Sequence, residues 1–119
     1  MGSPVVRWQI ITPRPKAAAD FYRQLFDWET TRDNMLGYEA VDTGSEAGIH
    51  GGIWPAPPQA QPFVQLFMEV DDCAAAAARA VGLGAKMLIP PQQLPDGDTM
   101  AILHDPDGMS FGLVASRPV

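Results

Sequence analysis

Apolar and polar positions follow the same order in the two halves of the chain. A strand pattern at 5–11 gives way to proline and polar residues and then to a helical pattern that ends at Phe26. The second half repeats this order, with a strand pattern at 63–70 and an alanine-rich helical pattern that ends at Gly84. The start of the strand and the end of the helix are both separated from their counterparts in the other half by the same number of residues. Such a period predicts a supersecondary unit used twice, with each copy too small to bury its apolar face alone.

The first copy predicts a helix set between strands. Residues 5–11 mix β-branched and aromatic side chains with polar ones, which is typical of a strand whose two faces are covered differently. In 16–26 the apolar residues recur at helical spacing. Three short strand patterns follow, at 28–32, 37–43 and 48–54. We therefore expect the order βαβββ.

The second copy predicts the same order. Asp71-Asp72 can cap its helix and Gly82-Leu83-Gly84 can end it, and we expect Pro90-Pro91-Gln92-Gln93 to be irregular. Three further strand patterns complete the copy, at 85–89, 99–104 and 109–114.

The length of 119 residues suits a single domain with a real core. We expect module one at 4–54 and module two at 63–115. The proline-rich segment 55–62 lies between them and cannot form a continuous strand ladder, so we expect a connector there.

Composition narrows the class of partner. The net charge of −6 opposes binding to nucleic acid and to anionic membrane surfaces. No apolar stretch approaches the roughly 18 residues that span a bilayer, and the first residues lack the features of a secretory signal. A single cysteine, Cys73, cannot form an internal disulfide and fits a reducing compartment. We expect a cytoplasmic protein whose partner is a small molecule.

Five segments resemble the glyoxalase, bleomycin-resistance and extradiol-dioxygenase superfamily, also called vicinal oxygen chelate. They are 21–28 and 48–53 in the first module and 69–72, 84–86 and 105–114 in the second. The resemblance implies an α+β fold in which two βαβββ modules form a curved mixed sheet with helices on its outer face. It also implies a ligand on the concave side and a homodimer. Because this superfamily hosts lyases, dioxygenases, epimerases and binding proteins, the resemblance fixes no activity.

The same resemblance implies metal ligands on the first and last strands of each module, usually His and then Glu. The repeat spacing carries these positions onto Arg7, Trp54, Gln65 and Gly112. A permanent cation, an indole and a glycine offer no donor, and an amide is a poor substitute for imidazole. We therefore expect no metal centre and no cofactor, which removes the main support for a metal-dependent glyoxalase reaction.

Strand alternation predicts which side chains line the concave face. We expect Trp54 and Phe67 to stack on a ligand, because aromatic walls with a few polar groups are typical of small-molecule sites. The polar groups that would orient it are Arg7, Gln9, His50 and Gln65. The opposite faces carry side chains suited to burial under the helices, namely Trp8, Ile10, Leu66, Met68 and Val70.

The leading hypothesis is a bleomycin-resistance-like protein that binds a small apolar or aromatic molecule without a metal. The alternative is a metal-dependent lyase, isomerase or dioxygenase with a non-standard site, for which His50, Glu69 and His104 are the candidate ligands. A third possibility is a purely structural or regulatory dimer with a collapsed cavity. The sequence identifies no catalytic residue and leaves open whether any reaction is catalysed.

Overall fold

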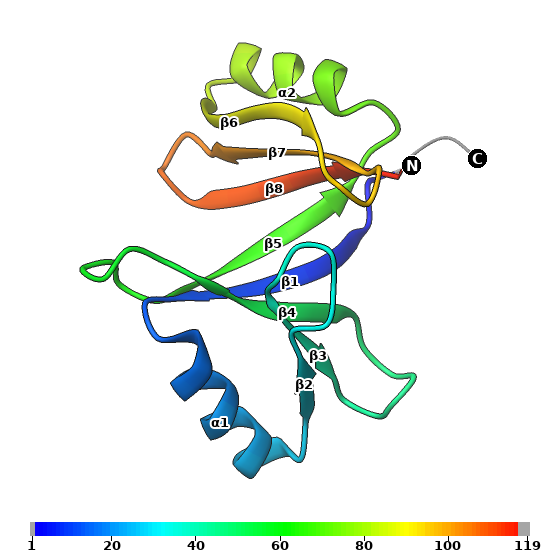
Figure 1. The fold of residues 1–119 in the computed structure, drawn as a ribbon. Coiled ribbons are helices and arrows are strands. Elements are labelled where there is room, and N and C mark those ends of the chain that lie inside the picture. Colours follow the sequence, from blue (N-terminus) through cyan, green and yellow to red (C-terminus); the bar gives the residue numbers. More distant parts are fainter. Residues whose placement is uncertain (1, 117–119) are drawn as a thin grey trace. The chain divides into compact units, whose positions relative to one another are not determined.

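The computed structural model describes residues 2–116. Over this range the chain forms the order βαβββ twice (Figure 1). The first set is β1 (Val5–Thr12), α1 (Pro15–Phe26), β2 (Glu29–Thr31), β3 (Glu39–Asp42) and β4 (His50–Pro55). The second set is β5 (Phe63–Glu69), α2 (Cys73–Gly82), β6 (Lys86–Gln93), β7 (Thr99–His104) and β8 (Ser110–Ala115). The predicted α+β class and the repeated βαβββ order are confirmed.

The described residues divide into two compact units. Arg7–Gln65 form the N-terminal unit, and residues 66–116 together with 2–6 form the C-terminal unit. The start of β1 thus belongs to the C-terminal unit, where the N–H of Glu69 donates to the carbonyl of Pro4 at 2.9 Å. The start of β5 belongs to the N-terminal unit.

In the N-terminal unit the strand order is β2-β3-β4-β1. β1 runs parallel to β4, whereas β3 is antiparallel to both β4 and β2, so the pairing is mixed. α1 packs against β2, β3 and β4. Its first residue is Pro15, whose fixed φ and missing N–H suit the first turn of a helix. Ala19 of α1 is buried against Val41 and Ile53 of the strands, and Trp8 and Ile10 pack against this cluster as predicted.

In the C-terminal unit the strand order is β5-β8-β7-β6. β5 runs parallel to β8, and the other neighbours are antiparallel. α2 begins after Asp72, whose Oδ1 accepts a hydrogen bond from the N–H of Ala75 at 3.0 Å. α2 covers β6, β7 and β8 (Figure 1). Its small Ala77 side chain is fully buried against Leu103 and Leu113.

Two expectations about this unit are wrong. β6 does not end at 89 but continues through Pro90 and Pro91, with irregular register to β7. It is the last strand in the order, and an edge strand with bulges tolerates prolines because fewer of its N–H groups are needed for pairing. Leu66 is 43% exposed instead of covered, because α2 packs over β6, β7 and β8. Val70 does pack against the core beneath α2.

None of the helices formed by residues 2–116 is long and apolar enough to cross a membrane.

The buried core of the C-terminal unit predicts a strong effect at one leucine. Leu103 is fully buried and Leu83 is 69% exposed. Leu103→Ala should lower the free energy of unfolding by about 2–5 kcal/mol, because it removes buried methyl groups and leaves a cavity. Leu83→Ala, the matched control, should change it by less than about 0.5 kcal/mol. Urea denaturation followed by circular dichroism measures both. Equal effects of the two substitutions would contradict the assignment of this core.

Candidate functional site

The sheet face of the N-terminal unit that lies opposite α1 carries two stacked aromatic rings. Tyr38 precedes β3 and Trp54 lies in β4. Their ring centroids are 4.3 Å apart and their planes differ by only 8°. Both residues are only half-buried. We call Tyr38 and Trp54 the aromatic pair.

A glycine makes this arrangement possible. A Cβ atom placed on Gly52 would lie 2.4 Å from the Tyr38 ring, much closer than any real contact. The ring therefore rests directly on the backbone of β4. Any side chain at this position would push the ring away, so Gly52 is required for the aromatic pair to form.

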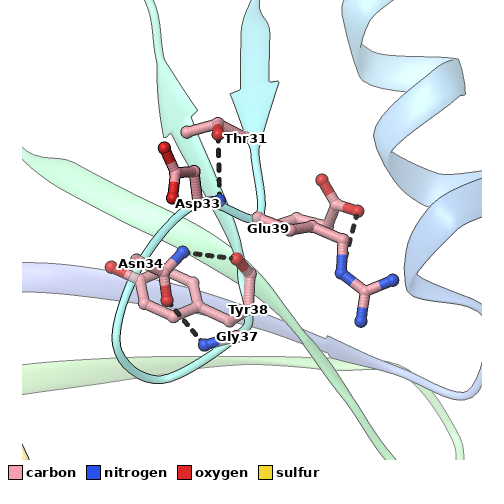
Figure 2. A network of polar contacts seen from close by, with 7 residues as sticks. Thr31, Asp33, Asn34, Gly37, Tyr38 and Glu39 are labelled. Carbon is pink, nitrogen blue, oxygen red and sulfur yellow. Dashed lines mark hydrogen bonds and ion pairs between the residues drawn. The ribbon is translucent and has the colours of Figure 1, made fainter.

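The turn between β2 and β3 holds Tyr38 in place (Figure 2). Asn34 Oδ1 accepts hydrogen bonds from the N–H groups of Gly37 at 2.7 Å and Leu36 at 3.0 Å. Its Nδ2 donates to the carbonyl oxygen of Tyr38 at 2.8 Å. Gly37 has φ +75°, a conformation that glycine adopts without strain. One asparagine side chain thus connects both ends of the turn and fixes the backbone from which the Tyr38 ring projects.

Two further contacts support the same turn (Figure 2). The N–H of Asp33 donates to Thr31 Oγ1 at 3.0 Å. Arg32 Nε lies 3.9 Å from Glu39 Oε1 in an ion pair that is mostly exposed on the arginine side. Because exposed ion pairs contribute little, we attribute the fixed position of Tyr38 to the hydrogen bonds of Asn34.

Two glutamines form the polar part of this face. Gln9 lies directly opposite Gly52 in the parallel pair of β1 and β4, so its side chain is on the face of the aromatic pair. Gln65 Nε2 donates to Gln9 Oε1 at 3.0 Å. Gln65 is 5% exposed, whereas Gln9 is half-buried. The structure therefore brings together two predicted site residues that are distant in the sequence.

The remaining predicted residues have different surroundings. Arg7 and His50 face each other across β1 and β4 at the start of both strands, and both are exposed. Phe67 belongs to the C-terminal unit and is 4% exposed, packed with Ile102 and Val114. Five of the six predicted residues thus lie in the N-terminal unit.

The C-terminal unit repeats the contact between a ring and a glycine. A Cβ atom on Gly112 would lie 2.3 Å from the Phe67 ring. Phe67 pairs with Gly112 as Gln9 pairs with Gly52. Gly52, and not Trp54, is therefore the counterpart of Gly112. The assignment of Trp54 by repeat spacing is wrong, because the spacing that relates the first strands and helices does not extend to the last strands.

These positions do not fit a divalent metal ion. The last-strand positions are both glycines with an aromatic ring over the backbone, and the first-strand positions are Arg7 and Gln65. Among residues 2–116 no three His, Cys, Asp or Glu side chains gather closely enough to hold an ion. His50 lies in β4, Glu69 in β5 and His104 in β7. The donor set that metal chemistry requires is not assembled from the described residues.

Tyr38 is the site residue that the sequence analysis missed. The pattern over 37–43 predicted a strand, and Asn34 to Gly37 is turn chemistry. Its stacking on Trp54 depends on the register in which Ala40 pairs with Gly52, and this register is not visible in the sequence.

Cys73 is part of the core. Its Sγ lies 3.6 Å from the carbonyl oxygens of Thr99 and Leu113, and the residue is 3% exposed. Burial raises the pKa of the thiol, and the nearby Asp72 carboxylate adds to this effect. Because both causes disfavour the thiolate, Cys73 has the properties of a structural cysteine and not of a reactive one.

The contact between Tyr38 and Gly52 gives a direct prediction. Gly52→Ala should displace the Tyr38 ring from Trp54, reduce the near-UV circular dichroism of the stacked rings, and lower the free energy of unfolding by about 1–3 kcal/mol. Gly82→Ala is the control, since Gly82 ends α2 and a Cβ there meets nothing within 4 Å. It should leave the near-UV spectrum unchanged. An unchanged spectrum in Gly52→Ala would refute the seating of the ring.

The burial of Cys73 predicts slow thiol chemistry. At pH 8 the native protein should react with a disulfide reagent such as dithionitrobenzoate at least roughly ten-fold more slowly than the urea-unfolded chain, because the folded thiol is buried and its pKa is raised. The pKa of this thiol is higher in the folded protein than in the unfolded chain. Its contribution to the free energy of unfolding should therefore decrease as the pH rises above the pKa that the thiol has in the unfolded chain. Equal rates for native and unfolded protein would contradict this description.

Comparison with known proteins identifies relatives for nearly the whole chain. The family model described as "Glyoxalase-like domain" matches residues 7–114. Two curated relatives, both named "Putative glyoxylase CFP32", come from Mycobacterium bovis and Mycobacterium tuberculosis. Each is 26% identical to this chain over 115 residues, which cover 92% of this chain and 43% of the relative. This chain therefore spans less than half the length of the curated relatives.

Solved structures share the fold. A methylmalonyl-CoA epimerase from Mycobacterium tuberculosis has a TM-score of 0.66 at 16% identity, covering 96% of this chain and 88% of the other. A Streptomyces coelicolor methylmalonyl-CoA epimerase in complex with 2-nitronate-propionyl-CoA has a TM-score of 0.63 at 19% identity, covering 98% of this chain and 99% of the other. At these identities the likeness establishes the fold alone.

Proposed function

Because the chain belongs to the glyoxalase-like domain family, we propose that it binds a planar apolar or aromatic small molecule, without the metal centre that the resemblance to the vicinal oxygen chelate superfamily implies. The observation that carries this proposal is the aromatic pair: the rings of Tyr38 and Trp54 stack with centroids 4.3 Å apart, and the Tyr38 ring rests on Gly52. Both rings are partly accessible. A planar ligand can extend the stack or pack against the ring edges, and each such contact contributes roughly 0.5–1.5 kcal/mol beyond the area buried.

The polar groups beside the rings would orient the ligand. Gln9 is placed opposite Gly52, and Arg7 lies two residues earlier on the same face of β1. His50 faces Arg7 across the strand pair. A stacking surface with a few hydrogen-bonding groups at its border is the usual composition of a small-molecule site. Sequestration of the bleomycin-resistance type needs only affinity, so the proposal requires no reacting group.

Phe67 belongs to the C-terminal unit, where its ring is 4% exposed and packs over Gly112, and the proposed site does not include it. We further propose that the protein acts as a homodimer in the cytoplasm and binds neither nucleic acid nor membranes. The net charge of −6 supports the last part, because it opposes association with phosphate groups.

The alternative, a metal-dependent lyase, isomerase or dioxygenase, has no specific observation in its favour. The likeness to epimerases is one of fold. The first-strand and last-strand positions offer an arginine, a glutamine and two glycines, none of which is a good ligand for a divalent ion.

A thermal-shift assay with planar aromatic probes such as naphthalene and quinoline tests the proposal. Trp54→Ala should abolish the stabilisation that these probes confer, because it removes half of the stacking surface. Phe21→Ala is the matched control, since Phe21 is an exposed aromatic residue on α1. That variant should respond to the probes like the wild-type protein. Unchanged probe affinity in Trp54→Ala would refute the assignment of the site.

A further inference from the structure

We propose that Gln65 determines which end of the Gln9 amide faces the ligand, so that the N-terminal unit selects planar aromatic molecules with a hydrogen-bond acceptor at the ring edge. This inference rests on the proposed function and deepens it, since it names the chemical class of the ligand and the residue that sets the preference.

The hydrogen bond between the two glutamines has a direction. Gln65 Nε2 donates to Gln9 Oε1 at 3.0 Å. A glutamine side chain has one acceptor oxygen and one donor NH₂ group. Since the oxygen of Gln9 faces Gln65, its Nε2 group is directed to the other side. Gln65 is 5% exposed and makes a further interaction besides this hydrogen bond, so it is held more firmly than the half-buried Gln9.

Gln9 lies on the same sheet face as the aromatic pair. Gln9 is the register partner of Gly52, and the Tyr38 ring rests on Gly52. Trp54 lies two residues further along β4 on the same face and stacks on Tyr38. A planar ligand on these rings would present its edge atoms to the Gln9 NH₂ group.

The face of β1 that carries Gln9 also carries a second side chain with hydrogen-bond donors. Arg7 shares the face with Gln9 and can only donate hydrogen bonds. An acceptor at the ligand edge, such as a ring nitrogen, a carbonyl or a carboxylate, would accept a hydrogen bond from the Gln9 NH₂ group. A ligand with only N–H or O–H groups at its edge would set donor against donor and leave both unsatisfied, which is an efficient way to reject it.

Three planar probes of similar size test the preference. Quinoline has an acceptor nitrogen at its edge, indole has a donor N–H, and naphthalene has neither. Dissociation constants are measured for each by NMR titration of the ¹⁵N-labelled protein at neutral pH. The wild-type protein should bind quinoline about three- to ten-fold more tightly than indole or naphthalene, the effect expected of one hydrogen bond.

Two substitutions separate the roles of the glutamines. Gln9→Glu keeps an oxygen for Gln65 but replaces the NH₂ group by a second oxygen, so the preference should invert toward indole. Gln65→Leu removes the donor that orients Gln9 and leaves the amide free to rotate. The preference should then shrink to within about two-fold. Phe21→Ala, on α1, should keep the wild-type order of affinities.

The outcomes distinguish this inference from the proposed function. If all three probes bind the wild-type protein equally and Trp54→Ala removes their binding, the aromatic site stands and the role of the glutamines is refuted. Retention of the quinoline preference in Gln9→Glu refutes it as well. If no probe binds the wild-type protein at all, the proposed function is itself contradicted, and this inference with it.

Discussion

The seating of the Tyr38 ring on the backbone of Gly52 is the contact on which the candidate site depends. A ring can approach a strand this closely only where no side chain intervenes, and a Cβ at Gly52 would lie 2.4 Å from it. The contact brings Tyr38 into parallel stacking with Trp54 and covers the backbone beside Gln9. The turn built around Asn34 holds Tyr38 for this purpose. The glycine at position 52, the Asn34 turn and the strand register thus together position the Tyr38 ring against Trp54.

The C-terminal unit contains the same contact between a ring and a glycine, but there the ring is buried. Phe67 rests on Gly112 as Tyr38 rests on Gly52, but the Phe67 ring is buried with Ile102 and Val114 and has no stacking partner among the described aromatic residues. In both units a ring covers the last-strand position where the superfamily resemblance implies a carboxylate ligand. At both positions an apolar contact between a ring and the backbone stands where that resemblance implies a charged ligand.

The sequence predicted the fold well because the fold depends on local periodicity. The strand and helix patterns of both halves gave the repeated βαβββ order, and Asp72 caps α2 as its position suggested. The predictions that depend on how strands pair with one another were wrong. β6 extends through Pro90 and Pro91 because it lies at an edge, and Trp54 is not the counterpart of Gly112.

For the candidate site, alternation along β1 and β4 predicted that Gln9 and Trp54 share one face, and the structure adds the hydrogen bond from Gln65. Tyr38 could not be found in this way, since its contribution comes from the β3–β4 register and from the absence of a side chain at Gly52. Aromatic contacts over glycine are properties of tertiary structure, and no periodicity in the sequence encodes them.

We propose that this surface binds its ligand through aromatic rings and amides, at positions where the superfamily resemblance implies metal ligands. Metal analysis by mass spectrometry tests it most directly, on protein expressed in medium supplied with nickel, zinc, iron and manganese and purified without chelator. The account predicts far less than one equivalent of any of these metals. A stoichiometric ion that is lost in His50→Ala would contradict it.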